Sequence, residues 1–216
     1  MTNNFDLILP MLDFSQEGTF YYIQLMRRKK DNPDAKSVKV IKDMYVDNLE
    51  YLQDREESII EMCDFFNARA YIRMNRRSYQ DVSYQLNVDL AKSLQSNQYK
   101  HVSRLFSKAC GRTHVEPNKV WVIDLDFEDV DMSSVVIETR NYMESTIQFK
   151  EYRQNILNTI SELQSEINNR DYKIIGEIPT PNGLHILTNP FNVKKFNERL
   201  PDIDIHKDNP TILYTP

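Results

Sequence analysis

Short runs of alternating apolar and polar residues recur along the chain and predict most of its β-strands. In residues 20–26 and 38–46 the alternation is typical of a strand with one covered face. Residues 120–123 are instead consecutively apolar, which indicates a strand covered on both faces. The same criteria predict strands at residues 70–74, 120–127, 173–178, 184–187, 203–205 and 211–214.

Longer segments with apolar residues every three or four positions predict helices between these strands. Residues 47–66 form one such segment, with Asp47 or Asn48 as the N-cap. The other predicted helices are residues 78–95, 98–109 (stopped at Gly111), 145–169 and 193–200. Between two of the strands, the Asn182–Gly183 step predicts a tight hairpin turn that uses positive-φ residues.

This order of elements predicts an α+β fold with mixed sheets, because strands and helices alternate irregularly around a hairpin. No internal repeat, low-complexity segment or Pro/Gly/Ser-rich linker interrupts the chain. We therefore expect a single domain over residues 1–216. Its chemical motifs fall within residues 70–214, and residues 1–67 form an extension of less certain role.

Composition narrows the class of protein. The chain has 216 residues, of which 40% are hydrophobic, yet no apolar run approaches the roughly 20 residues that cross a bilayer, so we expect no membrane partner. Four glycines are too few for a multi-glycine phosphate loop. Two cysteines cannot form a disulfide framework and fit a reducing compartment. The first ten residues carry no basic side chain, unlike a signal peptide, so we expect a cytoplasmic location.

The net charge of −5 argues against a protein that binds DNA by charge alone. The charges are nevertheless clustered. Basic residues gather at 27–30 and 69–77, and acidic residues gather at 124–131. This distribution is compatible with an enzyme that holds nucleic acid in a local basic groove beside an acidic metal site.

Asp124 and Asp126 lie two residues apart on the predicted strand 120–127, so both side chains point to the same face. Two carboxylates this close repel each other and raise each other's pKa. A divalent cation between them relieves the repulsion, and oxygen ligands suit Mg²⁺ or Mn²⁺. The alternative is that one carboxylate ends the strand and the other is solvated.

Two further polar sites lie on predicted strands. His185 follows the tight turn and is either a phosphate contact or a hydrogen-bonded structural residue. Asp202 and Asp204 form a second alternating pair, which either completes a metal site from a neighbouring strand or marks a charged sheet edge. Cys110 and His114 have zinc-ligand chemistry, but no second pair lies at suitable spacing, so we expect no zinc.

In this order, the three acidic and histidine motifs resemble those of the archaeo-eukaryotic primase (primase-polymerase) superfamily. Its first motif is hydrophobic-Asp-hydrophobic-Asp, as in residues 123–126. Its second is small-x-His, as in residues 183–185, and its third is hydrophobic-Asp or hydrophobic-Glu, as in Ile203-Asp204, with Asp202 a weaker match. The resemblance covers residues 70–214.

This resemblance implies an αβ module packed on an RRM-like module, with a two-metal site that uses Mg²⁺ or Mn²⁺. By position, Asp124, Asp126 and Asp204 would be metal ligands, and His185 would contact the phosphates of the incoming nucleotide. The reaction would be nucleotidyl transfer, in which charge stabilisation and in-line positioning do most of the catalysis.

Four further residues are candidate nucleotide contacts. Arg73, Asn75 and Arg76 belong to a strand that resembles the superfamily's early strand, and forked arginine side chains suit phosphates. A solvated strand edge is the alternative for these arginines. Lys207, three residues after Asp204, is either a phosphate contact or a surface charge.

The sequence thus predicts a metal-dependent primase-like nucleotidyltransferase of phage or plasmid replication. Its partners would be nucleoside triphosphates, a single-stranded DNA template, and a helicase or other replication proteins. Two alternatives remain open: a catalytically inactive primase-fold protein that binds nucleic acid, and a metal-dependent nuclease, because clustered aspartates with a histidine also serve hydrolysis.

Overall fold

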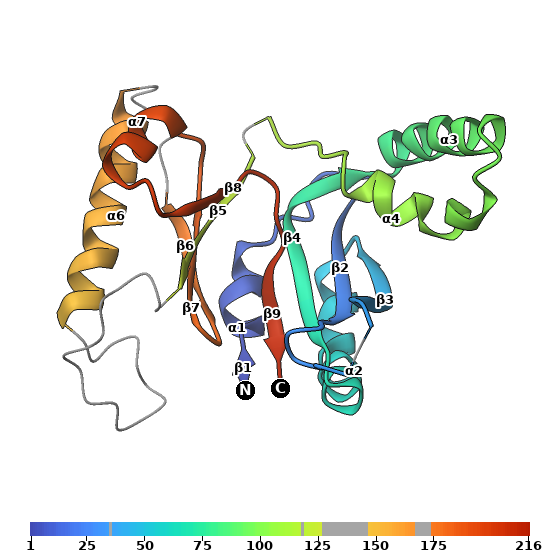
Figure 1. Ribbon diagram of the computed structural model, residues 1–216, viewed down its shortest axis with the longest axis horizontal. Coiled ribbons are helices and arrows are strands. Elements are labelled where there is room, and N and C mark those ends of the chain that lie inside the picture. The colour runs from blue at the N-terminus through green and yellow to red at the C-terminus, as the bar shows by residue number, and fades with distance from the viewer. Residues whose placement is uncertain (35, 118, 127–146, 167–173) are drawn as a thin grey trace. The chain divides into compact units, whose positions relative to one another are not determined.

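A computed structural model describes residues 1–34, 36–117, 119–126, 147–166 and 174–216. The chain divides into two compact units, each described here by itself. Unit 1 comprises Met1–Pro117 and Pro210–Pro216, and unit 2 comprises Asn118–Asn209. Each unit contains one antiparallel sheet and α-helices, which confirms the α+β class (Figure 1).

Unit 1 is built on a five-stranded sheet in the order β1-β9-β4-β2-β3. The last strand of the chain, β9, therefore lies inside the sheet, between β1 and β4. The strands are β1 (Thr2–Asn3), β2 (Thr19–Arg27), β3 (Lys39–Val46), β4 (Arg69–Ser78) and β9 (Thr211–Thr215). The helices are α1 (Phe5–Ile8), η1 (Leu9–Met11), α2 (Leu49–Phe66), α3 (Tyr79–Gln95), η2 (Tyr99–Arg104) and α4 (Leu105–Cys110).

Local capping explains where the helices of unit 1 begin and end. The Asn48 side chain accepts a hydrogen bond from the Tyr51 amide at the start of α2, as an N-cap does. Asn67 ends α2 in the left-handed region, at φ 45°. The predicted helix 98–109 is instead two short helices, the 3₁₀ helix η2 followed by α4.

A buried arginine joins the sheet of unit 1 to α4. The Arg77 side chain is fully buried, and its Nε donates to the Cys110 carbonyl oxygen at 2.6 Å. This carbonyl lies at the C-terminal end of α4, where a positive charge is favourable. Beside it, Phe20 and Tyr22 of β2 pack against Val82 of α3 and against α4.

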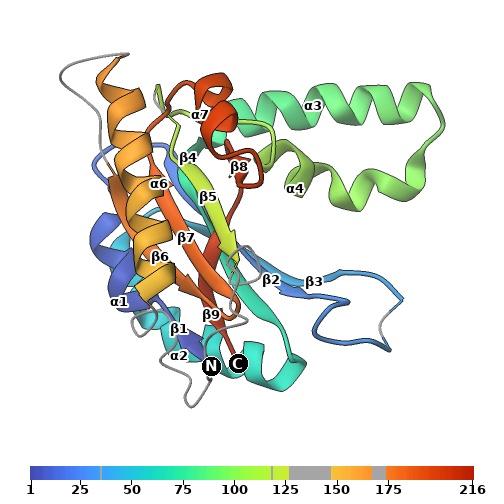
Figure 2. The ribbon, with the colours of Figure 1, turned by 60° about the vertical axis from the view of Figure 1, so that its left-hand side comes forward.

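Unit 2 is built on a four-stranded sheet in the order β6-β7-β5-β8. Its described elements follow the chain as β5 (Trp121–Asp126), α6 (Ile147–Ser165), β6 (Ile174–Thr180), β7 (Gly183–Thr188), α7 (Val193–Arg199) and β8 (Asp204–His206). Helices α6 and α7 contribute to one apolar core against this sheet (Figure 2). The core includes Ile123 and Leu125 of β5, Ile186 of β7, Ile156, Ile160 and Leu163 of α6, and Phe196 of α7.

The structure corrects two expectations about the sheets. Strand pairing is antiparallel throughout the described part, where mixed sheets were predicted. In unit 2 the reason is the strand order. The two strands joined through α6, β5 and β6, are not neighbours, because β7 lies between them, and β5 likewise separates β7 from β8, which are joined through α7. The strand in between runs opposite to both of its neighbours.

The hairpin turn between β6 and β7 is centred on Pro181–Asn182, and no described residue near it has positive φ. Proline fixes φ near −65°, so this turn needs no left-handed residue.

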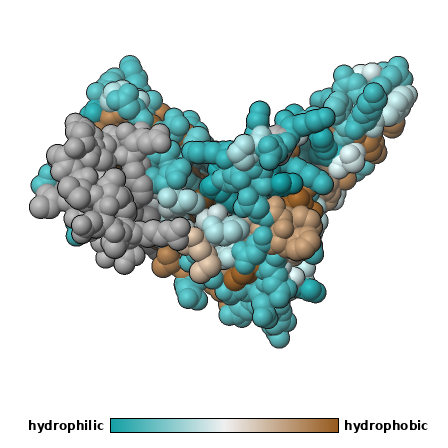
Figure 3. Space-filling view, turned by 60° about the horizontal axis from the view of Figure 1, so that its bottom comes forward, coloured by the Kyte–Doolittle hydropathy of each residue, from teal (hydrophilic) through white to brown (hydrophobic). Residues whose placement is uncertain are grey.

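One face of the molecule shows how exposed apolar residues are distributed there. On the face shown in Figure 3, hydrophobic residues form small patches separated by hydrophilic ones. Among the described residues, no helix combines the length and the apolar character that a membrane span requires.

Candidate functional site

The centre of the candidate site in unit 2 is Asp124 on β5. Strand register places Asp124 directly opposite His185 on β7 and directly opposite Asp204 on β8. Side chains that oppose each other across an antiparallel pair point to the same face. His185, Asp124 and Asp204 therefore form a row across three neighbouring strands.

Asp126 extends this row along β5, because residues two apart on a strand share a face. The intervening residues Ile123 and Leu125 point the other way, into the core with α6 and α7. All four acidic and histidine residues predicted from the motifs thus lie on the face of the sheet opposite that core. Asp202 lies in the turn that precedes β8, so Asp204 is the carboxylate in register with Asp124.

Two members of the row, His185 and Asp124, are in direct contact. His185 Nε2 lies 3.3 Å from Asp124 Oδ1. The His185 side chain is 11% exposed and the Asp124 side chain 35% exposed, so solvent reaches the carboxylate more readily than the imidazole. Asp204, on the edge strand β8, is exposed. The row therefore runs from a buried imidazole to an open carboxylate, which suits a site that receives its ligand from solvent.

Three carboxylates on one face create an electrostatic conflict. Directly opposed side chains such as those of Asp124 and Asp204 have Cβ atoms about 4.5–5.5 Å apart, and like charges there are destabilising. Asp126 adds a third charge about 7 Å further along the strand. These hard oxygen donors fit Mg²⁺ or Mn²⁺ in chemical type, and a divalent cation would offset their repulsion. Within the described residues, no three His, Cys, Asp or Glu side chains already converge as a metal cluster.

Gly183, the small residue of the second motif, has a steric role. It lies directly opposite Asp126. A Cβ atom at this position would lie 1.8 Å from the carbonyl oxygen of Leu125. Only glycine therefore lets β7 approach β5 this closely, and the approach positions both Asp126 and His185.

The candidate nucleotide contacts on β4 belong to unit 1. Arg76 is held by two carboxylates: its Nε donates to Glu116 Oε1 at 2.6 Å and its Nη1 to Asp13 Oδ2 at 3.0 Å. The hydrogen bond with Glu116 raises the pKa of Arg76. The register of β4 against β2 shifts between Arg73 and Arg77, so alternation alone does not assign Arg73, Asn75 and Arg76 to faces of the sheet; Asn75 is buried. Arg76 is part of an ion-pair network.

Lys207 is not on the face that carries the acidic row. Its Nζ lies 5.2 Å from the centre of the Trp121 ring, which packs in the core on the helix-covered face. Reasoning from sequence missed His206, which opposes Val122 on β5 and shares the face of Asp204. The signal for His206 was its spacing of two residues from Asp204.

Comparisons of the chain with protein-family models, with curated proteins and with solved structures found no match.

Proposed function

We propose that unit 2 carries the site of a divalent-metal-dependent nucleotidyltransferase of the primase-polymerase type. The observation that carries this proposal is the register of Asp124 between His185 and Asp204, with Asp126 on the same face. The order of elements adds support. The described elements of unit 2 follow the order β–α–β–β–α–β, with the first and third strands in the centre of the sheet, and this order is compatible with the RRM-like module that the superfamily resemblance implies.

In this proposal Asp124, Asp126 and Asp204 hold the metal ions. When bound, the ions supply positive charge at the attacking hydroxyl and at the leaving pyrophosphate. The imidazole of His185 lies against Asp124 Oδ1 at the edge of the proposed metal site, where a ring N–H would donate to a phosphate oxygen. The 3′-hydroxyl loses its proton to solvent as its oxygen bonds to the α-phosphorus of the incoming nucleotide. The bond from the α-phosphorus to the bridging oxygen breaks, and pyrophosphate leaves with that electron pair.

The test is incorporation of labelled nucleotides, as ribo- and deoxyribonucleoside triphosphates, on a single-stranded DNA template with Mg²⁺ or Mn²⁺. Asp124→Asn and Asp204→Asn keep the side-chain shape and remove the charge, so each should abolish incorporation and weaken Mn²⁺ binding. Asp202→Asn is the matched control, because Asp202 precedes β8 and should leave both measurements unchanged.

Two results would overturn the proposal. If the wild-type protein binds nucleotide and Mn²⁺ but never incorporates nucleotide, the alternative of a catalytically inactive binding protein replaces the proposed enzyme. If labelled DNA is cleaved with metal in the absence of nucleotides, and Asp124→Asn stops the cleavage, the nuclease replaces it.

A further inference from the structure

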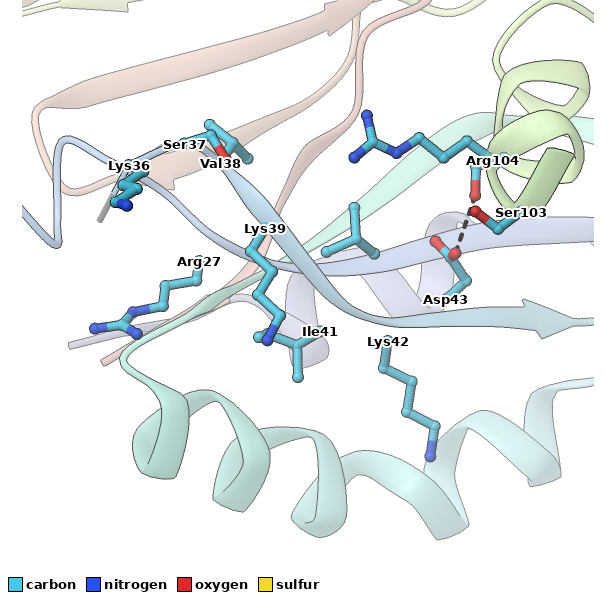
Figure 4. A pocket seen from close by; sticks show the side chains of 12 residues that line it. Arg27, Lys36, Ser37, Val38, Lys39, Ile41, Lys42, Asp43, Ser103 and Arg104 are labelled. Atoms are coloured by element: carbon cyan, nitrogen blue, oxygen red, sulfur yellow. Dashed lines mark hydrogen bonds between the residues drawn. The ribbon is translucent and has the colours of Figure 1, made fainter. Parts of the chain in front are cut away.

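A basic groove lies along the free edge of the sheet in unit 1. Its residues are distant in sequence from the row of Asp124, Asp126, His185 and Asp204 in unit 2. The groove has a volume of about 750 Å³ and follows β3, the last strand of its sheet. One wall comes from the hairpin that joins β2 to β3, and the other comes from η2 and α4 (Figure 4). We call this cavity the β3 groove. Its lining residues are Arg27, 36–43, Ser103, Arg104 and Ser107.

The charge of the β3 groove favours an anionic occupant. Five exposed cations line it, and none of the five forms an ion pair with any residue that the structure describes. They are Arg27, Lys36, Lys39, Lys42 and Arg104. The acidic residue of the lining, Asp43, accepts hydrogen bonds from Tyr22, Gln24 and Ser107, so its carboxylate is committed to the wall.

Strand register concentrates this charge. Arg27 on β2 directly opposes Lys39 on β3, and like charges opposed across a strand pair are destabilising. Figure 4 shows Arg104 projecting over β3 from η2, whereas Lys39 and Lys42 leave the strand on the side of α2. The cations therefore bracket the open edge of β3. Backbone N–H groups at a sheet edge add further donors for an anion.

Edge lysines also occur as protection against edge-to-edge aggregation. That role explains Lys39 and Lys42 but not Arg104, which reaches the cavity from a separate helix. Nor does it explain the like-charge pair of Arg27 and Lys39.

Two exposed aromatic rings lie beside the same hairpin. Phe65 is 82% exposed and Phe66 is 40% exposed, and their ring centres are 4.8 Å apart at the end of α2. The next residue, Asn67, fixes this end to the hairpin: its Nδ2 donates to the Asp31 carbonyl, and its carbonyl accepts from Asn32. A basic groove combined with exposed aromatic rings is typical of proteins that bind single-stranded nucleic acid, because the cations hold the backbone and the rings stack on unpaired bases.

We propose that the β3 groove binds the phosphate backbone of a single-stranded nucleic acid, with Phe65 and Phe66 stacking on its bases. The choice of nucleic acid among polyanions rests in part on the proposed function, and the groove itself lies in the other unit. The α2 helix that bears the rings carries six acidic residues and one basic residue, so the more favourable path for the strand is the edge of β3, between Arg104 on one side and Lys39 and Lys42 on the other, rather than the body of α2.

The test is fluorescence anisotropy of a labelled 20-nucleotide oligo(dT) with the full chain in EDTA, over a series of salt concentrations. Lys39→Glu combined with Arg104→Glu should weaken binding by at least about tenfold and reduce the salt-dependence slope by about 1.4, from two lost phosphate contacts. The matched control is Lys150→Glu combined with Lys194→Glu, two exposed lysines of unit 2, which makes the same change in net charge. This control should bind as wild type does.

Phe65→Ala should weaken binding about fivefold or more, and Phe65→Tyr, which keeps a ring, should not. The proposal is overturned if the wild-type protein does not bind the oligonucleotide at 50 mM salt, or if the groove variant binds as its control does. The assignment to nucleic acid is also overturned if heparin binds as tightly as the oligonucleotide and Phe65→Ala changes neither affinity.

The two proposals fail separately. Asp124→Asn should bind the oligonucleotide as wild type does, because it lies outside the groove. Groove-dependent binding without nucleotide incorporation would overturn the proposed function alone. If the groove variant incorporates nucleotides and binds the oligonucleotide as the wild-type protein does, only the proposal for the β3 groove is overturned.

Discussion

Replacing Gly183 with alanine tests whether close approach of β7 to β5 holds the candidate site together. Ordinary contacts of a Cβ begin at 3.4 Å, so an added carbon 1.8 Å from the Leu125 carbonyl would be too close by about 1.6 Å. The obstructing atoms are backbone, at Leu125 and at Asp126. No side-chain rotation relieves the clash, so the two strands must separate.

The cost follows from what that separation breaks. Overpacking in a well-packed region costs typically 1–3 kcal/mol. Losing about two ladder hydrogen bonds adds about 0.5–1.5 kcal/mol each. The Gly183→Ala protein should therefore be less stable by roughly 2–6 kcal/mol. At about 2–4 °C per kcal/mol for a chain of this size, its Tm should fall by roughly 5–20 °C.

The chain supplies its own probe and its own controls. Trp121, the single tryptophan, lies on β5, so thermal unfolding followed by tryptophan fluorescence reports on unit 2. At Gly111 an added Cβ meets backbone atoms at an ordinary 3.5 Å, and Gly111→Ala should change stability by less than about 1 kcal/mol. At Gly18 there is open space but φ is +72°, so Gly18→Ala should cost about 1–2 kcal/mol.

Because Gly18 and Gly111 lie in unit 1 and Trp121 reports on unit 2, the melting of all three variants is also followed by far-UV circular dichroism. The expected order of damage is Gly183, then Gly18, then Gly111. If the fluorescence melting curve of Gly183→Ala coincides with that of the wild-type protein, the argument for enforced proximity of β5 and β7 is refuted.

Three further predictions concern unit 1. Arg76→Met should lower the stability by about 1–3 kcal/mol in denaturant titrations, because Glu116 and Asp13 lose their partner; full stability would contradict a structural role. Cys63 and Cys110 are fully buried, and burial raises the pKa of each thiol to about 12, so neither should react with a disulfide reagent at pH 8 until the protein unfolds. Above pH 9 the unfolded thiols lose protons that the folded thiols keep, so stability should fall between pH 9 and 12 by about 1.4 kcal/mol per pH unit for each thiol. Denaturant midpoints at pH 8.5 and 10.5 check this, and Cys63→Ala should reduce the slope; a pH-independent midpoint would contradict it.

Most elements of the fold could be predicted from sequence because their signals are local. The N-cap at Asn48 and the alternation of residues 20–26 need no information from distant residues. By contrast, β1 and α1 were not predicted, because four or fewer residues carry no measurable period. Tertiary contacts form them instead: β1 pairs with β9 from the far end of the sequence, and Phe5 is fully buried.

In the candidate site, too, some features have a local signal in the sequence and others depend on pairing between distant strands. Alternation along one strand was enough to predict that Asp124 and Asp126 share a face. Register between strands decided the rest, since only pairing shows that Asp204 rather than Asp202 opposes Asp124. The strand predicted at residues 70–74 extends to Ser78, and its register against β2 shifts between Arg73 and Arg77. Neither the extension nor the shift has a local signal, so the binding of Arg76 to Glu116 and Asp13 could not be predicted from sequence.

The position of β9 within the sheet of unit 1 constrains how the chain matures on the ribosome. Strand β4 cannot gain its second neighbour until residues 211–215 have been synthesised, seconds after β4 itself at about 5–20 residues per second. Unit 2 is encoded without interruption between the two parts of unit 1, and its strand β8 ends only five residues before β9 begins. While the whole of unit 2 is being synthesised, unit 1 would thus lack its last strand, with one side of β4 open to chaperones.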